Sequence, residues 1–504
     1  MKYTVRLIIA ALAASAALVS CTKDLAPGKS DTDSAAGTLR TVTVSFDTPT
    51  KSYLDGNQPR FSKGDSVLVS DGTALDTCAV DVVGKKTIIR TKLEGETLLS
   101  AVYPYTAAVF DNYGNLVDVK IPAIQTGKFA DANICMANQS DQGNKDNLRF
   151  RNKVAILKFY ADESIGVDTI RVSCAEGKIA SGADTIVVTA PKVEKSQLSN
   201  PTQDPRIWYV AMHDIKDATS LTFESVTSTQ GTVTKKPKIA GDGKNEISIG
   251  YIYSVFIPYY IKVKVNDTPE TYQKWGYCNV GAFLPEEPGL YFAWGDTTGY
   301  RWDAEKKQFE GGHSFTWENT PFNNDSTAFN ADYFATVRDE VCPNRVLALK
   351  YDAANFNWGG KWRMPTEEEF RTMYNATYFG WDDTDKGCYV YVPNPISDAG
   401  KCSNGDGSYT KSNALLFFPA AGGGTGEGLN NKGSWGYYRA SSLFSDHNGY
   451  ADYLYFRKDF HSTYPQDPYY RCSGLSIRPI YDDTISEDQP TTVTISAYSN
   501  GGTL

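Results

Sequence analysis

The sequence predicts an all-β N-terminal half, built from two β-sandwiches, and an α+β C-terminal domain. Between residues 40 and 265, short segments with the alternation and β-branching of strands follow one another closely, and helical periodicity is weak. Eight of the nine tryptophans lie at or after Trp275, so the composition changes abruptly in the second half. That half also contains a well-marked helix start, at residues 365–370. These three observations set the fold class.

The chain begins with the features of a lipoprotein signal peptide, predicted over residues 1–20. Lys2 and Arg6 precede an apolar stretch at residues 7–19, which is too short to span a bilayer. The LVSC sequence that ends at Cys21 resembles a bacterial lipobox, which implies cleavage before Cys21 and lipidation of that residue. Residues 22–24 resemble the export tag of Bacteroidota surface lipoproteins. We therefore expect a lipid-anchored protein at the cell surface, on the outer membrane, with a flexible tether at residues 21–39.

The strand patterns divide the N-terminal half into two predicted sandwiches, at residues 40–150 and 151–265. The first strand is expected at residues 41–46. More than 200 residues of short strands would most naturally form two sandwiches, with a break near residues 149–153. The other expected strands lie at residues 66–70, 87–91, 98–103, 117–121, 154–160, 169–173, 185–189, 221–226 and 251–256.

A third domain is predicted at residues 266–481. Thr366 followed by Glu369 forms a capping box, so a helix is expected from there through about residue 375. Trp358 and Trp362 are expected in the core, with Arg363 in a structural ion pair. The rest consists of short strands and long loops, which often carry function. Residues 491–498 of the tail, 482–504, are either a lone strand or part of a disordered end.

Composition argues against several functions. The net charge of −9 and the pI near 5.2 argue against nucleic-acid binding. The chain has only 4 histidines and shows none of the common catalytic motifs, so we expect neither an enzyme nor a cofactor or metal site. After Cys21 the cysteines are scattered without a CxxC pair; buried free thiols are expected for most, and one or two disulfides remain open.

The first half resembles the fimbrillin-like proteins of Bacteroidota pili. That resemblance implies transthyretin-like sandwiches, lipoprotein export and assembly with pilin subunits by strand exchange, in which a donated strand fills an open groove. In the family, a trypsin-like cut after an arginine near the first strand can open the groove, and Arg40 is the matching residue. The motifs that carry the resemblance lie at residues 61–69, 101–105, 121–125 and 148–155.

The second half resembles the major paralogous domain family first described in Fibrobacter. This implies a C-type-lectin-like fold, as in formylglycine-generating enzymes and in the variable proteins of diversity-generating retroelements. Formylglycine-generating enzymes need a pair of cysteines near the domain end, whereas only Cys472 lies there. Family members commonly carry Trp where this chain has Arg439. The matching motifs lie at residues 275–282, 285–296, 357–366, 416–422 and 474–480.

Residues 437–472 are rich in side chains that favour a recognition surface. Leu454 and Phe456 are expected to face inward, and Tyr453, Tyr455 and Arg457 the other way. Retroelements randomise adenines in codons of the Asn type, which can produce each candidate residue as well as Cys472; Lys458 and Gln466 fall outside that set and are expected to be framework. The candidate ligand-binding residues are Tyr437, Arg439, Phe444, Asp446, His447, Tyr450, Asp452, Tyr453, Asp459, His461, Tyr464, Asp467, Tyr469 and Arg471. Whether this surface is diversified or is an ordinary lectin-like loop stays open.

These observations predict a cell-surface or pilus-tip adhesin that presents a lectin-like ligand-binding surface, and whether that surface is hypervariable stays open. Its expected partners are pilin subunits, a surface protein or glycan as ligand, and the membrane through the lipid anchor, with no nucleic acid. Two alternatives remain open at this point. One is a formylglycine-type or carbohydrate-active enzyme, and the other is a structural pilus subunit or anchor without a ligand of its own.

Overall fold

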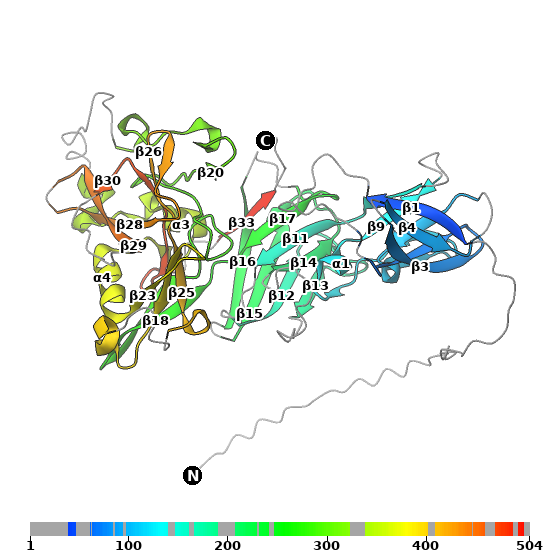
Figure 1. Cartoon of the computed structure of the whole chain (residues 1–504), viewed down its shortest axis with the longest axis horizontal. Coiled ribbons are helices and arrows are strands. Elements are labelled where there is room, and N and C mark those ends of the chain that lie inside the picture. The colour runs from blue at the N-terminus through cyan, green and yellow to red at the C-terminus, as the bar shows by residue number, and fades with distance from the viewer. Residues whose placement is uncertain are drawn as a thin grey trace, which may run out of the picture.

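Seven strands of the first block close into a barrel in the computed structural model (Figure 1, the blue block). β1 pairs with β10 in parallel and with β4 in antiparallel orientation, so it joins the two sides that a sandwich would leave open. The prediction of a β-sandwich for this block is therefore corrected to a closed barrel. In barrel order the strands are β1 (Arg40–Phe46), β10 (Asn147–Asn152), β9 (Cys135–Asn138), β5 (Ser100–Tyr103), β2 (Ser66–Ser70), β3 (Leu75–Val83) and β4 (Lys86–Thr91).

The structure describes residues 39–46, 61, 63–83, 86–93, 97–139, 147–160, 166–189, 207–228, 231–240, 246–322, 338–401, 409–445, 447–458, 469–486 and 492–497. The predicted signal peptide, Cys21 and nearly all of the tether lie outside these residues. Within the described ranges, no helix has the length and apolar character needed to cross a bilayer.

A connector between β5 and β9 joins the barrel to the second block. Ala107, Ile121 and Ile134 of this connector are buried in the core of the second block. Its strand β8 extends the sheet of that block by pairing with β13 in parallel. The two N-terminal blocks thus share a strand and a core. The connector contains η1 (Tyr105–Ala107), β6 (Ala108–Phe110), β7 (Leu116–Val119), β8 (Ile124–Gln125) and α1 (Phe129–Ala132).

The second block is a nine-stranded sheet that folds over on itself. Phe159 of β11 and Phe223 of β15 lie four strands apart in the sheet order, yet their ring centroids are 5.7 Å apart. The two halves of the sheet therefore face each other across one core, as predicted for a sandwich. The order is β14 (Ile207–Met212), β11 (Ala155–Tyr160), β17 (Ile252–Phe256), β33 (Thr492–Ala497), β16 (Gly231–Ala240), β15 (Leu221–Thr227), β12 (Val167–Cys174), β13 (Thr185–Thr189) and β8.

The tail strand β33 lies inside this sheet rather than at its edge. It runs parallel to β16 and antiparallel to β17, with Ile495 opposite both Ile239 and Val255. Figure 1 shows it as the red strand among green ones. Of the two alternatives for the tail, the structure has the strand. Because β17 and β33 are neighbours in space, the whole C-terminal domain is an insertion between two strands of the second block.

Several small sheets and short helices build the described part of the C-terminal domain. The first sheet contains β18 (Tyr260–Asp267), β19 (Glu270–Gly276), β32 (Ile480–Tyr481) and β22 (Trp362–Arg363). The second contains β23 (Tyr378–Asp382), β24 (Gly387–Tyr391) and β25 (Leu416–Pro419), and the third β27 (Gly428–Asn430), β26 (Gly423–Thr425) and β31 (Gly474–Leu475). The fourth contains β28 (Trp435–Leu443), β29 (Tyr450–Arg457) and β30 (Tyr469–Tyr470), and β20 (Trp302–Asp303) pairs with β21 (Gln308–Phe309). The helices include α3 (Ala353–Trp358) and α4 (Glu367–Ala376), and residues 338–341 are also helical. Short 3₁₀ turns lie at Glu310–Gly312, Trp317–Asn319, Pro343–Arg345, Leu349–Tyr351, Ile396–Lys401 and Lys411–Asn413, and a further one, Ala218–Ser220, precedes β15 in the second block.

Local predictions for this domain are confirmed. The Thr366 hydroxyl accepts a hydrogen bond from the Glu369 amide at 3.2 Å, and the Glu369 carboxylate accepts one from the Thr366 amide at 2.8 Å, so α4 begins with a capping box. Trp358 and Trp362 are buried. Arg363 forms ion pairs with Glu369 at 2.6 Å and Asp482 at 2.7 Å. The seven described cysteines after Cys21 are all buried free thiols.

Candidate ligand-binding face of the C-terminal domain

One face of β28 and β29 carries a cross-strand series of aromatic and cationic side chains, in the block that contains α4 (Figure 1). Side chains alternate between the two faces of a strand, so every second residue shares a face. The strand register places Trp435 opposite Arg457, Tyr437 opposite Tyr455, and Arg439 opposite Tyr453. We call these residues the ladder: Trp435, Tyr437, Arg439, Tyr453, Tyr455 and Arg457.

The opposite face of the same strands is locked into the domain core. Leu454 and Phe456 are buried there, which confirms their predicted inward orientation. The Tyr438 hydroxyl donates a hydrogen bond to the Pro419 carbonyl at 2.6 Å. A Cβ atom added to Gly436 would lie 2.1 Å from the Phe456 ring, so no larger residue fits at this position without a shift. This packing fixes the positions from which the ladder side chains project.

Tyr437 is the centre of the aromatic cluster on the ladder. Its ring centroid lies 5.4 Å from that of Tyr455, 5.3 Å from Tyr469 and 5.9 Å from both Trp435 and Tyr453. Burial raises the pKa of Tyr437, so its phenol stays protonated at neutral pH. Tyr437 and Tyr453 are 4% and 7% exposed, whereas Trp435, Tyr455 and Tyr469 are half-buried. The half-buried rings are therefore the part of the cluster that a partner can reach first.

Arg439 is fully buried next to these rings and has an incomplete set of partners. Its Nη2 donates to the carbonyls of Tyr470 at 3.0 Å and Ser473 at 2.7 Å. Its Nε and Nη1 atoms have no hydrogen-bond partner, and no carboxylate oxygen of the described residues lies within 4.0 Å of the guanidinium. Burial lowers the pKa of Arg439 to about 10, which still leaves it charged at neutral pH. This candidate ligand-binding residue is thus an interior cation that has no counter-ion among the described residues.

A second buried arginine shows what complete pairing looks like in the same domain. Arg478 donates to Asn279 Oδ1 at 2.8 Å and to the carbonyls of Gly276, Tyr277 and Phe417 at 3.2, 2.8 and 2.8 Å. Its guanidinium also lies 4.5 Å from the centroid of the Phe418 ring. Arg439 and Arg478 are equally buried, so they differ in pairing rather than in exposure.

Two other candidates, Asp452 and Arg471, and the neighbouring Cys472 lie in the interior instead of on the ladder. Asp452 shares the parity of Leu454 and Phe456, so it projects from the face opposite the ladder, and it is 9% exposed. Burial, reinforced by the nearby Glu367 carboxylate, raises the pKa of Asp452 to about 6. Arg471 donates to the Asn448 carbonyl at 2.6 Å and lies 5.6 Å from the ring centroids of both Trp294 and Trp317. Cys472 is buried beside it.

The turn between β28 and β29 carries a separate, more exposed group. His447 is exposed, and its ring lies 5.0 Å from that of Tyr450. Tyr450 stacks on Tyr470 at 4.8 Å, and Tyr470 is 46% exposed. Phe444 is half-buried, and its carbonyl accepts a hydrogen bond from Arg345. These residues border the ladder but do not belong to it.

The structure leaves part of the predicted set untested and adds residues to it. Asp446, Asp459, His461, Tyr464, Asp467 and Gln466 lie outside the described residues. Lys458, predicted as framework, donates to Asp383 at 2.6 Å. Trp435 and Tyr470 were not among the candidates, although alternation from Tyr437 predicts that Trp435 shares its face.

The predicted processing residue, Arg40, is the first residue of β1. It pairs with Thr91, and its Nη1 donates to the Thr97 carbonyl at 2.9 Å. A cut after Arg40 would leave residues 41–46 in the barrel, where they pair on both sides. Such a cut frees the N-terminal peptide but does not by itself vacate the position of β1.

Comparison with known protein families and with curated proteins gives no match for the sequence. Among solved structures, a candidate cell adhesion protein from Bacteroides uniformis is 12% identical, with a TM-score of 0.28, covering 44% of this chain and 91% of its own. A second candidate cell adhesion protein, from Bacteroides ovatus, is 12% identical with a TM-score of 0.24. The match covers 46% of this chain and 94% of that protein. The tip fimbrial protein Mfa3 from Porphyromonas gingivalis, with a C-terminal truncation, is 11% identical with a TM-score of 0.16. The match covers 38% of this chain and 87% of that protein. Scores this low leave the assignment of function to the site itself.

Proposed function

We propose that this chain is a cell-surface adhesin that binds a surface protein or glycan through the ladder of its lectin-like C-terminal domain. The observation that carries the proposal is Arg439, a buried cation with two unused donors beside a cluster of aromatic rings. A buried charge whose donors are only partly paired destabilises a fold, so its presence within a recognition surface favours a role in binding.

The chemistry of the ladder favours a ligand with an apolar face and an acidic group. Aromatic rings pack against sugar rings and apolar side chains, and Trp, Tyr and Arg dominate the energetics of protein interfaces. The Nε and Nη1 atoms of Arg439, which have no partner among the described residues, can each donate a hydrogen bond to an anionic oxygen of the ligand. A hydrogen bond to a charged group contributes about 1.5–3 kcal/mol, so this pairing would supply a large share of the affinity.

Glycan and protein arrays with the full chain, produced without its signal peptide, test this proposal. Tyr455→Ala removes a half-buried ladder ring, and Tyr272→Ala, on an exposed position of β19, is the matched control. We expect ligands that bind the parent protein and the Tyr272→Ala variant but not the Tyr455→Ala variant. Hits that survive Tyr455→Ala unchanged would place binding elsewhere on the chain.

We also propose that the protein is anchored in the outer membrane through Cys21 and assembles with pilin subunits by strand exchange at the barrel. β1 is the strand to exchange, because it closes the barrel between β10 and β4 and buries Val42 and Val44. Deletion of residues 40–46 should create an open groove that captures pilin, whereas a cut after Arg40 alone should not. Radiolabelled palmitate should enter the parent protein and not a Cys21→Ala variant.

Diversification of the ladder is a further part of the proposal. If a retroelement alters this domain, sequence changes among close strains should concentrate at Tyr437, Arg439 and Tyr453, and the framework residues Leu454 and Phe456 should stay constant. Changes spread evenly along residues 437–472 would oppose this idea.

A further inference from the structure

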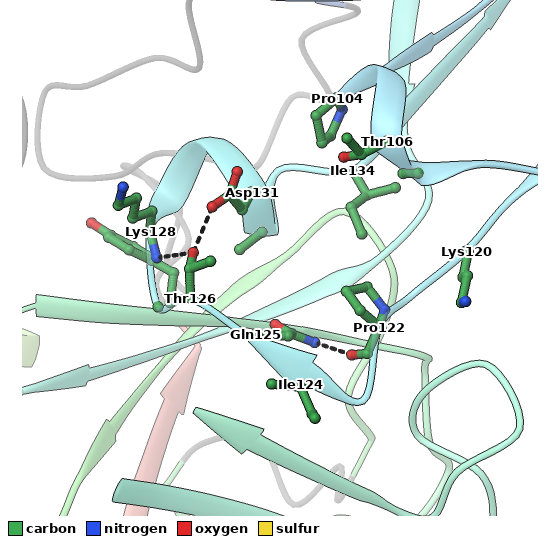
Figure 2. A pocket seen from close by; sticks show the side chains of 14 residues that line it. Pro104, Thr106, Lys120, Pro122, Ile124, Gln125, Thr126, Lys128, Asp131 and Ile134 are labelled. Carbon is green, nitrogen blue, oxygen red and sulfur yellow. Dashed lines mark hydrogen bonds between the residues drawn. The ribbon is translucent and has the colours of Figure 1, made fainter. Parts of the chain in front are cut away.

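A pocket of about 330 Å³ lies where the barrel meets the nine-stranded sheet. Figure 2 shows that it opens between the α1 segment, the β8 strand and the turn that follows β5. Its apolar lining includes Pro104, Ala107, Ile124 and Ile134. Volumes of this size are typical of ligand sites, which often lie between domains. The ladder belongs to a different block of the molecule, so this pocket is independent of the proposed adhesin site.

The strand β8 gives the pocket a free sheet edge. It is the last strand in the order of the nine-stranded sheet, and among the described strands it pairs with β13 alone. The Ala123 carbonyl accepts a hydrogen bond from the Val187 amide at 2.8 Å, so the main-chain carbonyl of Ala123 faces β13. In a parallel pair the next residue points the other way, and the N–H and C=O of Ile124 therefore face the open side. The Ile124 side chain is 77% exposed, which is unusual for a large apolar residue.

This edge is held rigidly in place by the Gln125 side chain. Its Nε2 donates to the Pro122 carbonyl at 2.9 Å and to the Ala211 carbonyl at 2.7 Å. Its Oε1 accepts from the Ala211 amide at 2.8 Å. Gln125 thereby ties β8 to β14 from within the block, and the edge needs no ordering before a partner binds. Such preorganisation lowers the entropic cost of association.

The pocket is flanked by positive charge. Lys128, in the α1 segment, and Lys120, after β7, lie on opposite sides of it in Figure 2. Both are exposed, and no carboxylate oxygen of the described residues lies within 4.0 Å of either ammonium nitrogen. Asp131, the acidic residue of the lining, accepts a hydrogen bond from the Thr126 hydroxyl at 2.5 Å. The charge at the two ends therefore complements an acidic partner.

We propose that this pocket binds an extended, acidic peptide segment of another protein, which adds a strand to the edge of β8. The main chain of the peptide would pair with the N–H and C=O of Ile124, and one apolar side chain would enter the pocket beside Ile134. Acidic residues on either side would meet Lys120 and Lys128. Main-chain pairing supplies affinity in this mode of recognition, and pockets and charges supply specificity.

Synthetic peptides test this proposal on the full chain without its signal peptide. The probe is a labelled pentapeptide, acetyl-Glu-Val-Thr-Val-Asp-amide, followed by fluorescence anisotropy at low salt. We expect this probe to bind at least about tenfold more tightly than the same peptide with lysines at both ends. The acidic ends of the probe attract Lys120 and Lys128, whereas lysines at these ends would repel them. Double reversal of the pocket lysines, Lys120→Glu with Lys128→Glu, should reverse this preference, whereas Lys86→Glu on the barrel should not change it.

Peptide chemistry separates strand addition from simple charge attraction without altering the protein fold. A version of the probe methylated on alternate amide nitrogens keeps its charges and side chains but cannot pair with a strand edge. We expect its affinity to fall about tenfold or more. Equal binding of the methylated probe, equal binding of the single amino acid acetyl-glutamate-amide, or no binding of the acidic probe at millimolar concentration would each overturn the proposal.

Discussion

Replacing Arg439 by methionine is expected to leave the fold as stable as before, or to stabilise it, while weakening ligand binding by about tenfold or more. Methionine has a similar length and no charge, so it can occupy the same space among the rings of the ladder. The matched control is Arg478→Met in the same domain. Both arginines are 0% exposed, but Arg478 has a partner for every donor group that it directs at the protein, and Arg439 does not.

The expected change in the free energy of unfolding follows from the contacts of Arg439 and of Arg478. Each of the two unused donors of Arg439 lowers the stability of the fold by about 1–3 kcal/mol, and Arg439→Met recovers this loss. Against this stands the loss of its two hydrogen bonds to carbonyls, at about 1.5–3 kcal/mol each. The midpoints of these two ranges nearly cancel, and removal of a buried charge adds stability, so the free energy of unfolding should change by between zero and a gain of about 3 kcal/mol. Arg478→Met strands its four acceptors and should cost about 3–5 kcal/mol.

Tryptophan fluorescence during urea or thermal unfolding measures this difference, because eight of the nine tryptophans lie at or after Trp275. The signal therefore reports the C-terminal domain rather than the two N-terminal blocks. For a domain of roughly 200 residues, 1 kcal/mol corresponds to about 2–4 °C in Tm. A loss of stability in Arg439→Met as large as that in Arg478→Met would refute the idea that Arg439 is kept for binding.

Three further predictions concern the framework. Gly436→Ala should destabilise the C-terminal domain by about 1–3 kcal/mol in urea unfolding, because the new Cβ would lie 2.1 Å from the Phe456 ring; an unchanged midpoint would contradict the packing described for β28. Deletion of residues 487–504 removes β33 from between β16 and β17 and exposes two strand edges. Light scattering should then show self-association that the full chain lacks. A monodisperse monomer would argue against β33 as a structural strand. Burial raises the pKa of Asp452 to about 6, so the folded protein binds this proton more tightly than the unfolded chain, and the contribution of Asp452 to stability falls as the pH rises from about 4 to 6. Asp452→Asn should therefore flatten the decline of Tm over this range, and an identical decline in both proteins would show that Asp452 is not responsible.

The sequence was sufficient for features that depend on neighbouring residues. The capping box of Thr366 and Glu369 needs only local spacing, and it appears as predicted at the start of α4. Strand alternation assigned Leu454 and Phe456 to the inner face, since that pattern repeats every two residues. The burial of Trp358 and Trp362 followed from their size and apolar surroundings.

Features that depend on contacts between residues far apart in the chain could not be predicted from local sequence patterns. Alternation places Arg439 on the ladder face, but it does not reveal that the carbonyls of Tyr470 and Ser473, over 30 residues away, enclose its guanidinium. The barrel closure through β1 requires pairing with β10, which is separated from it by most of the block. The insertion of β33 between β16 and β17 joins segments more than 200 residues apart, and no local signal in residues 492–497 specifies that neighbour.

The affinity of the protein for a ladder ligand and for its carboxyl methyl ester tests the central claim most directly. The ligand is the strongest array hit that requires Tyr455, and Kd is measured by calorimetry for the parent protein and for Arg439→Met. The account predicts that esterification weakens binding to the parent by about tenfold or more, equivalent to about 1.4 kcal/mol, and makes little difference to the residual binding of Arg439→Met. Equal affinity of the parent protein for the acid and the ester would contradict the account.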